Sequence, residues 1–571
     1  RTRAHEYGGG DFTVSGSLLY YVDDANQGVF VLDLRGGAPR QLTPLQTAGE
    51  DRYADFVVDH ERRRLVAVRE RHRPQAEPVN ELVAIDADGR GVEVMARGAD
   101  FYASPAVATD ALAWLQWNHP NMPWDGCELR LASLDAAGHP TQARTIAGGP
   151  AESIFQPSWD EDGRLYLVSD RSGWAQPYRW QDGGPHRLCE RKAEFAAPQW
   201  VFGTSTYGFD GEGSLVCAFT EGGTWKLGRL DPARDDLVET AQPYTDIAHV
   251  RVAGGRVFFR GGSPDRATEV VALDLADGTI ERLLPPVPAP VAPSGLSRPE
   301  AIRFPTSGGE YAHGFFYPPK NAEFEGEAGT QPPLIVVGHG GPTAAASTAL
   351  DPKIQFWTSR GFALLDVNYR GSTGFGRAYR DALKGRWGVS DVDDCVAGAR
   401  HLVDRGLVDG TRLAIRGSSA GGFTVLCAVT FHDVFRAAAC YYGISDLEAL
   451  ARDTHKFEAH YTDTLVGPYP ERIGLYRARS PIHHVDRRSC PLIVLQGLRD
   501  KVVPPSQAEA IVDAVRAKGL PVAYVTFADE GHGFRNADNG RRALEAELAF
   551  YAEIFGFVPA DELPGLAIEN A

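Results

Sequence analysis

The sequence lacks the features that mark membrane-spanning, nucleic-acid-binding and disulfide-bonded proteins. No run of about eighteen apolar residues occurs, so no segment predicts a transmembrane helix. Acidic residues outnumber basic ones by 75 to 58, and the net charge of -17 argues against nucleic acid or an anionic membrane as a partner. The seven cysteines are scattered without a CxxC pair, which favours free thiols in a reducing compartment. We therefore expect a cytoplasmic protein.

Helical periodicity is also missing from the first half of the chain. From Asp11 to about Pro286 the sequence shows short stretches with period-two alternation, broken by Gly, Asp and Pro. These stretches recur as six units of similar length, each with three β runs, and a β-sandwich would not produce units so alike. Repeats of this kind are typical of β-propeller blades. The units span residues 12–42, 53–95, 102–146, 154–188, 200–238 and 247–284.

The second half changes character after a proline-rich stretch. With 571 residues the chain is long enough for two domains. We assign 1–286 to the propeller and 287–299 to a stiff linker, because proline fixes φ. Strands and helices alternate over 300–560, which predicts an α/β-hydrolase domain with a mostly parallel sheet, followed by a tail at 561–571. Within that domain the predicted elements include a hairpin at 302–317, a strand at 362–369 and a helix at 392–403.

A candidate nucleophile lies in the stretch 417–422, Gly-Ser-Ser-Ala-Gly-Gly. An apolar run precedes it and a helix-forming run follows it, so a strand, a tight turn and a helix succeed one another. The pattern Gly-x-Ser-x-Gly in that setting is the nucleophile elbow, where small neighbours permit a strained turn that exposes one hydroxyl. Ser419, and not Ser418, is its central residue.

Partners for this serine follow in the order expected for the fold. A serine hydroxyl needs a histidine to accept its proton and a carboxylate to orient that histidine. Asp500 follows the apolar run 492–495, and His532 lies between two glycines after the strand predicted at 522–527. Because both come just beyond strand ends, we expect them at one edge of the sheet with Ser419.

An anion site completes the predicted centre. The apolar run 333–337 leads into Gly338-His339-Gly340-Gly341-Pro342, a segment poor in side chains whose amides can face a developing oxyanion. We predict a donor from Gly340 or Gly341 and a second donor from the amide of Ala420.

Several motifs together resemble the prolyl oligopeptidase family of serine peptidases. They lie at 339–342, 368–376, 387–394, 417–422, 497–504 and 530–534, and more loosely at 3–10 and 117–125 in the propeller. The chain is most similar to the acylaminoacyl peptidase and aminopeptidase branch, including enzymes that hydrolyse the amide of puromycin. The resemblance implies a propeller of seven blades over the hydrolase face. Since six units are visible and the chain begins at Arg1 without methionine, we expect one blade to be missing upstream, and a signal peptide there stays open.

The resemblance also implies a substrate class. We expect a serine peptidase acting through an acyl-enzyme on short peptides or amino-acid amides, and we favour an aminopeptidase for apolar or aromatic residues. Tyr442, Val502 and Val503 lie where the family lines its primary specificity pocket. Glu6 and Asp125, in the two propeller motifs, are candidates to pair with the substrate amine. The paired-glutamate motif of dipeptidyl peptidases does not occur, so release of dipeptides is less favoured.

Other functions stay open at this stage. An acylaminoacyl peptidase, an oligopeptidase and a carboxylesterase would use the same catalytic residues, and a non-catalytic propeller scaffold is the alternative from another class. A homo-oligomer is also possible. His455, Glu458 and His460 carry metal-binding side chains, but the segment resembles the start of the family's helical insertion, and we predict neither a metal nor a cofactor.

Overall fold

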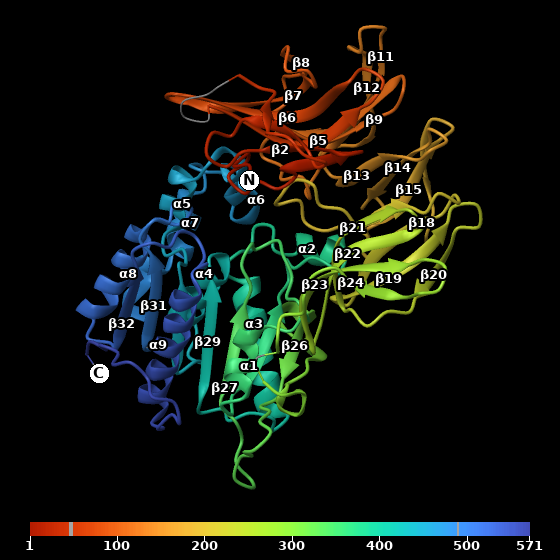
Figure 1. Ribbon diagram of the computed structural model, residues 1–571. Coiled ribbons are helices and arrows are strands. Elements are labelled where there is room, and N and C mark those ends of the chain that lie inside the picture. Colours follow the sequence, from red (N-terminus) through yellow and green to blue (C-terminus); the bar gives the residue numbers. More distant parts are fainter. Residues whose placement is uncertain (45–49, 290, 488–489, 571) are drawn as a thin grey trace.

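The alternating first half of the sequence folds into six four-stranded sheets. The computed structural model describes residues 1–44, 50–289, 291–487 and 490–570. In each sheet the strands pair in chain order, so successive hairpins make an antiparallel blade. The blades follow one another through the upper part of the molecule, above the second domain (Figure 1). The predicted β-propeller region with six visible blades is confirmed.

The blades have the following strands. Blades one to three contain β1 (Phe12–Ser15), β2 (Leu18–Val22), β3 (Val29–Asp33), β4 (Arg40–Gln41), β5 (Asp51–Asp59), β6 (Arg64–Arg73), β7 (Ala76–Asp86), β8 (Val92–Ala96), β9 (Phe101–Val107), β10 (Ala111–Trp117), β11 (Glu128–Leu134) and β12 (Pro140–Gly148). Blades four to six contain β13 (Ile154–Trp159), β14 (Leu165–Ser169), β15 (Gln176–Gln181), β16 (Gly184–Arg187), β17 (Tyr207–Phe209), β18 (Leu215–Glu221), β19 (Thr224–Asp231), β20 (Asp236–Thr240), β21 (Asp246–Ala253), β22 (Arg256–Ser263), β23 (Arg266–Asp274) and β24 (Ile280–Arg282).

The innermost strands join neighbouring blades through bulges. Asp55, Ser104, Gln156 and His249 have positive φ where the registers of β5, β9, β13 and β21 shift. A bulge turns polar groups out of the ladder and toward the next blade. The Ser104 amide donates to Asp55 Oδ2 at 2.6 Å, and the Thr206 amide donates to Gln156 Oε1 at 2.7 Å. These bonds link the second blade to the third, and the fourth blade to the residue just before the fifth.

The first and sixth blades belong to different parts of the propeller core. Buried residues of β2 and β3 cluster with those of β6 and β7, while residues of β22 and β23 cluster with those of β18 and β19. In the described part of the chain, no hydrophobic cluster contains residues of both the first and the sixth blade. The expected seventh blade stays a prediction.

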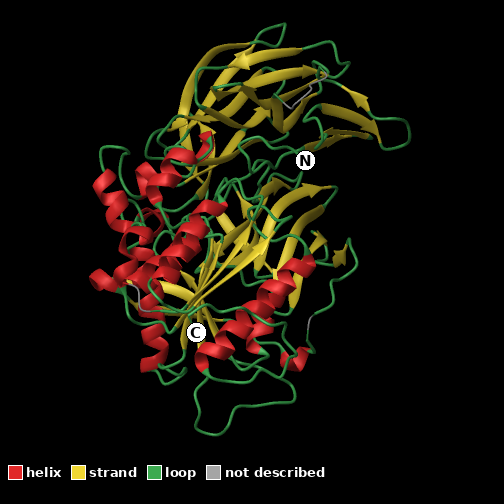
Figure 2. Cartoon of the chain, turned by 90° about the vertical axis from the view of Figure 1, so that its left-hand side faces the viewer, coloured by secondary structure: helices red, strands yellow, loops and turns green. Residues whose placement is uncertain are grey.

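The second half folds as the predicted α/β-hydrolase. Its sheet runs in the order β25-β26-β28-β27-β29-β30-β31-β32, antiparallel at the β25–β26 end and parallel elsewhere. Helices flank this sheet in the lower part of the molecule (Figure 2). The strands are β25 (Glu300–Pro305), β26 (Tyr311–Tyr317), β27 (Leu334–Gly338), β28 (Ala363–Asn368), β29 (Leu413–Ser418), β30 (Ala437–Tyr441), β31 (Leu492–Gly497) and β32 (Val522–Phe527).

Helices connect these strands. The α-helices are α1 (Pro352–Thr358), α2 (Arg377–Asp381), α3 (Ser390–Asp404), α4 (Ala420–Phe431), α5 (Leu447–Asp453), α6 (Tyr461–Leu465), α7 (Ile473–Arg479), α8 (Pro505–Ala517) and α9 (Ala537–Phe555). The 3-10 helices are η1 (Pro293–Gly295), η2 (Ser307–Gly309), η3 (Lys456–Glu458) and η4 (Pro481–Arg487). The hairpin, strand and helix predicted at 302–317, 362–369 and 392–403 correspond to β25–β26, β28 and α3. No described helix is long and apolar enough to cross a membrane.

Two predicted segments lie beside the domains. The linker 287–299 runs between the end of β24 and β25 and contains η1, while its residue Pro290 lies outside the described residues. In the tail 561–571, Glu569 and Val522 exchange backbone hydrogen bonds of 2.9 and 3.0 Å, so the tail pairs with the start of β32. Ala571 lies outside the described residues.

The two domains meet at a contact of complementary charge. The α2 side contributes Arg377, Arg380 and Lys384, and the propeller contributes Asp170 and Asp125. Both guanidinium groups reach Asp170 Oδ2, at 2.6 and 2.8 Å, and Lys384 Nζ lies 2.9 Å from Asp125 Oδ1. Asp170 is 2% exposed, so this contact excludes water and depends on close docking of the domains.

A buried carboxyl beside this contact predicts a pH effect on stability. Burial raises the pKa of Glu194 to about 7, and the guanidinium of Arg380 opposes that shift only in part. Between the unfolded pKa and about 7 the folded state holds a proton that the unfolded state has lost. Stability from this group is therefore greatest at low pH and falls as the pH rises.

We expect Glu194→Gln to remove that loss. Between pH 5 and pH 8 the free energy of unfolding of the variant should rise by about 1–3 kcal/mol relative to that of the parent, because glutamine carries no charge to desolvate. Unfolding measured at both pH values would test this. Glu190→Gln, at an exposed glutamate of the same segment, is the matched control. A difference between Glu194→Gln and the parent that does not change with pH would contradict the prediction.

Candidate active site

The candidate nucleophile lies at a strained turn between β29 and α4. Ser419 has φ 56° and ψ -121°, and residues other than glycine rarely adopt a positive φ. A Cβ on Gly421 would lie 2.1 Å from Gly338 O, and one on Gly417 would lie 2.4 Å from Gly421 O. Only glycine therefore lets the helix start so close to the neighbouring strand, which explains the glycines of the motif.

The structure brings the three predicted triad residues together. His532 Nε2 lies 2.9 Å from Ser419 Oγ, and His532 Nδ1 lies 2.8 Å from Asp500 Oδ2. Asp500 follows β31 and His532 follows β32, so adjacent parallel strands deliver both side chains to the same sheet edge. The chain of contacts from hydroxyl to imidazole to carboxylate can move a proton away from Ser419.

Hydrogen bonds from the backbone fix the carboxylate and the histidine loop. The amides of Val502 and Val503 both donate to Asp500 Oδ1 at 2.9 Å, which leaves Oδ2 for His532. Two residues before His532, the buried Glu530 accepts bonds from the amides of Arg535 and Asn536, at 3.1 and 2.9 Å. Two amides thus fix Asp500, and Glu530 ties down the loop that follows His532.

The residues of the predicted anion site lie near Ser419. Gly340 and Gly341 border the same cavity as Ser419, and a Cβ on Gly340 would lie 3.7 Å from Ser419 Cβ. Neither glycine amide donates a hydrogen bond to another described residue. Ala420 is the first residue of α4, where an amide has no partner inside the helix. The residues of all three predicted donors therefore line the same cavity as Ser419.

His339 turns away from this point. Its ring stacks on Tyr369 with 4.2 Å between centroids, and its Nε2 lies 2.7 Å from Ser372 Oγ. Burial lowers the pKa of His339 to about 4, despite its hydrogen bond to the Gly340 carbonyl. The imidazole is therefore neutral near pH 7 and supports the glycine loop, while His532 is the histidine that contacts the serine.

A cavity of about 360 Å³ opens in front of Ser419, between the two domains. The predicted residues Tyr442, Val502 and Val503 all line it, and the Tyr442 ring lies edge-on to His532 with 4.9 Å between centroids. Tyr7 and Trp200 reach it from the propeller. Mostly apolar and aromatic walls favour a hydrophobic side chain as occupant.

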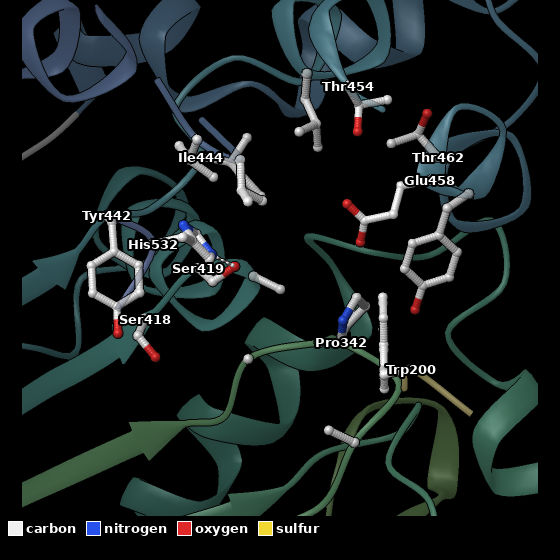
Figure 3. A pocket seen from close by; sticks show the side chains of 18 of the residues that line it. Trp200, Pro342, Ser418, Ser419, Tyr442, Ile444, Thr454, Glu458, Thr462 and His532 are labelled. Atoms are coloured by element: carbon white, nitrogen blue, oxygen red, sulfur yellow. Dashed lines mark hydrogen bonds between the residues drawn. The ribbon is translucent and has the colours of Figure 1, made fainter. Parts of the chain in front are cut away.

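The cavity contains one carboxylate, which the sequence did not identify as a substrate contact. Glu458, at the end of η3, points into the cavity across from Ser419 and His532 (Figure 3). Among the described residues no other acidic side chain lines this cavity. His455 Nε2 lies 3.3 Å from Glu458 Oε2. Burial lowers the pKa of His455, but the hydrogen bond and charge of Glu458, together with the charges of Glu6 and Glu70, outweigh burial and leave that pKa raised.

Glu6 and Asp125 lie elsewhere, so their assignment as substrate contacts needs correction. Neither lines the cavity. Arg52 Nη1 lies 2.6 Å from Glu6 Oε1, while Asp125 binds Lys384 at the domain contact. Both carboxylates therefore already have cationic partners. Their motifs pointed to the correct region of the propeller, but the side chains hold the protein together.

The segment that carries Glu458 does not form a metal site in the structure. His460 Nδ1 lies 2.8 Å from Asp463 Oδ2, and its ring packs against His119 rather than facing Glu458. The described residues contain no group of three or more His, Cys, Asp and Glu side chains that could hold a metal ion.

Comparisons with known proteins match both domains of the chain. The prolyl oligopeptidase family model matches residues 348–557. A puromycin-hydrolyzing peptidase of Mycobacterium tuberculosis superposes with a TM-score of 0.95 and 41% identity, covering 100% of this chain and 90% of that one. A mutant puromycin hydrolase complexed with PGG gives a TM-score of 0.94 and 36% identity, covering 100% of this chain and 89% of that one.

A further relative matches over a shorter stretch. Dipeptidyl aminopeptidase BIII of Pseudoxanthomonas mexicana is 32% identical over 274 residues, which is 43% of this chain and 39% of that protein. The match therefore covers less than half of the relative's own length.

Proposed function

The chain belongs to the prolyl oligopeptidase family of serine peptidases, and we propose that within this family it is an aminopeptidase for small substrates. Its substrates would be short peptides or amino-acid amides whose first residue is apolar or aromatic. The observation that carries the proposal is the carboxylate of Glu458, the one acidic side chain among the described residues that lines this mostly apolar cavity in front of Ser419. An ammonium group that leaves water must find an opposite charge, and Glu458 offers it.

The proposed chemistry proceeds through an acyl-enzyme. Ser419 Oγ attacks the carbonyl carbon of the scissile bond while His532 Nε2 accepts its proton. Asp500 stabilises the imidazolium through Nδ1. When the C–N bond breaks, His532 returns the proton to the leaving amine. Water then attacks the ester with the same histidine as base, and the free amino acid leaves.

The oxyanion of both tetrahedral intermediates would bind to backbone donors. The amides of Gly340 or Gly341 and of Ala420 are the proposed donors, and all three residues line the same cavity as Ser419, which supports this assignment. Preorganised donors stabilise developing charge at little reorganisation cost.

The walls of the cavity account for the proposed side-chain preference. Tyr442, Val502 and Val503 offer apolar surface beside the nucleophile. An apolar side chain gains about 25 cal/mol for each Å² that it buries there. Two relatives are named for hydrolysis of puromycin, which supports a small substrate.

A direct comparison of substrates tests the proposal. We expect amino-acid p-nitroanilides with a free amine, together with puromycin, to be cleaved faster than their N-acetylated forms. Faster cleavage of N-acetylated substrates would instead indicate an acylaminoacyl peptidase, and cleavage within long blocked peptides an oligopeptidase. Hydrolysis of the matching esters without the anilides would indicate a carboxylesterase.

Replacing the cavity carboxylate should remove the preference for a free amine. We expect Glu458→Gln to lower kcat/KM for free-amine substrates about 100-fold, because loss of one partner of a desolvated charge pair costs about 2–3 kcal/mol. Cleavage of an N-acetylated substrate should hardly change. Glu6→Gln is the matched control, since Glu6 lies outside the cavity and is paired with Arg52. Equal losses on both kinds of substrate would contradict this role for Glu458.

A further inference from the structure

The segment that carries Glu458 belongs to the hydrolase domain but is bound by the propeller. It connects α5, which ends at Asp453, to α6, which begins at Tyr461, and its only regular structure is the three-residue helix η3. So short a helix provides few internal hydrogen bonds. The place of Glu458 in the cavity therefore depends on what packs against this connection from outside.

Lys456 makes the polar part of that contact. Its ammonium donates to the carbonyl oxygens of Pro78 and Asp100, at 2.9 and 3.1 Å, which belong to the second blade and to the loop before the third. The Glu77 carboxylate lies 3.9 Å away, and the Phe101 ring centroid lies 5.1 Å from Nζ. The Lys456 side chain is 7% exposed, so these propeller groups replace most of its water.

Phe457 makes the apolar part. It is 2% exposed, and its ring stacks on His5 with 4.9 Å between centroids and meets Phe101 edge-on at 5.7 Å. Both partners belong to the propeller domain. Lys456 and Phe457 thus fix the two residues directly before Glu458 to the propeller, while Glu458 itself points into the cavity (Figure 3).

We propose that Lys456 is a positioning residue through which the propeller holds the Glu458 carboxylate where it can pair with the substrate amine. This inference rests on the proposed aminopeptidase function. The propeller then takes part in substrate recognition, because blades two and three determine where the amine-binding carboxylate lies. Loss of the Lys456 ammonium should allow the connection to move and should weaken amine binding without disturbing Ser419, His532 or Asp500.

The test compares two lysines at the domain contact. Lys456→Met keeps much of the aliphatic stem but removes the charge. Lys384→Met removes the ammonium that binds Asp125 at the α2 contact, away from η3. For each variant, kcat and KM are measured on a free-amine p-nitroanilide and on its N-acetylated form, and competent sites are counted by titration with a fluorophosphonate, so that misfolded protein does not enter the rates.

We expect Lys456→Met to lower kcat/KM for the free-amine substrate about tenfold, mainly through KM, and to leave the N-acetylated substrate within about twofold. Lys384→Met should not change the ratio of kcat/KM for the free-amine substrate to kcat/KM for the N-acetylated substrate. In a Glu458→Gln background, Lys456→Met should cause no further loss, because the carboxylate that it positions has been neutralised.

The outcomes separate this inference from the proposed function. If Glu458→Gln lowers the ratio but Lys456→Met does not, or if Lys384→Met lowers it equally, Lys456 has no positioning role and the aminopeptidase function stands. If Glu458→Gln leaves the ratio unchanged, the proposed function fails and the inference fails with it.

Discussion

Ser419→Ala is expected to reduce amide hydrolysis about 10⁵-fold or more while the protein stays folded. The substitution removes the hydroxyl that lies 2.9 Å from His532 Nε2 and leaves the backbone turn, its glycines and helix α4 in place. No other hydroxyl contacts that nitrogen among the described residues. Measurement of kcat on a free-amine p-nitroanilide, with the melting temperature as a check on folding, would test this.

Ser418→Ala is the control at the adjacent position. The Ser418 side chain lies beside the Tyr442 ring rather than beside His532 (Figure 3). It should therefore retain most of the activity, within about tenfold of the parent. If Ser418→Ala were the inactive variant and Ser419→Ala the active one, the register of the motif would be wrong.

Asp500→Asn is expected to have the next largest effect, a fall in kcat of about 10⁴-fold. The carboxylate accepts two amide bonds at Oδ1 and one imidazole bond at Oδ2. An asparagine can keep the acceptor toward Val502 and Val503, but it then presents an NH₂ group to His532. That group stabilises the tautomer with its proton on Nε2, which cannot accept the proton of Ser419.

The matched control for this variant is Asp529→Asn. Asp529 is an exposed aspartate three residues before His532, and it accepts a bond from Asn539 at 3.1 Å without contacting the histidine. Its activity should stay close to that of the parent. An Asp500→Asn enzyme that kept more than about a tenth of the parent kcat would show that another group orients His532.

The catalytic centre could be predicted from sequence because local patterns determine most of it. Glycines around Ser419 indicate a turn that few other residues permit, and the apolar runs before Asp500 and His532 end where parallel strands of one sheet end. Register and strand order then bring these residues together without further information. Gly417 and Gly421 belong to the motif itself, and at each of them an added Cβ would clash with a neighbouring backbone oxygen.

The amine-binding carboxylate could not be predicted in this way. Glu458 lies in a short connection with no pattern of its own, and the structure holds it through contacts with residues far away in the chain, such as Pro78 and Asp100. Glu6 and Asp125 are candidates from sequence only because they lie in the propeller motifs, where a structural role is at least as well supported, and each pairs with a cation that only the folded structure brings near. Partners that lie far away in the chain, in the same domain or in the other one, cannot be recognised from the local sequence.

The outer strands of the blades were missed for a related reason. Each repeat was expected to contain three β runs, while each sheet has four strands. The fourth strands are short or exposed, as β4 and β20 show, so they do not alternate between apolar and polar residues. An inner strand buries one face against its neighbours and keeps the pattern, whereas an edge strand does not.

Mapping the adduct of a fluorophosphonate probe tests the central assignment most directly. The probe reacts only with a serine activated by a nearby base, and mass spectrometry of the digested protein identifies the modified residue. We predict a single adduct on Ser419 in the parent protein, lost in Ser419→Ala and retained in Ser418→Ala. An adduct on any other residue, or continued labelling of Ser419→Ala, would contradict the assignment of the nucleophile.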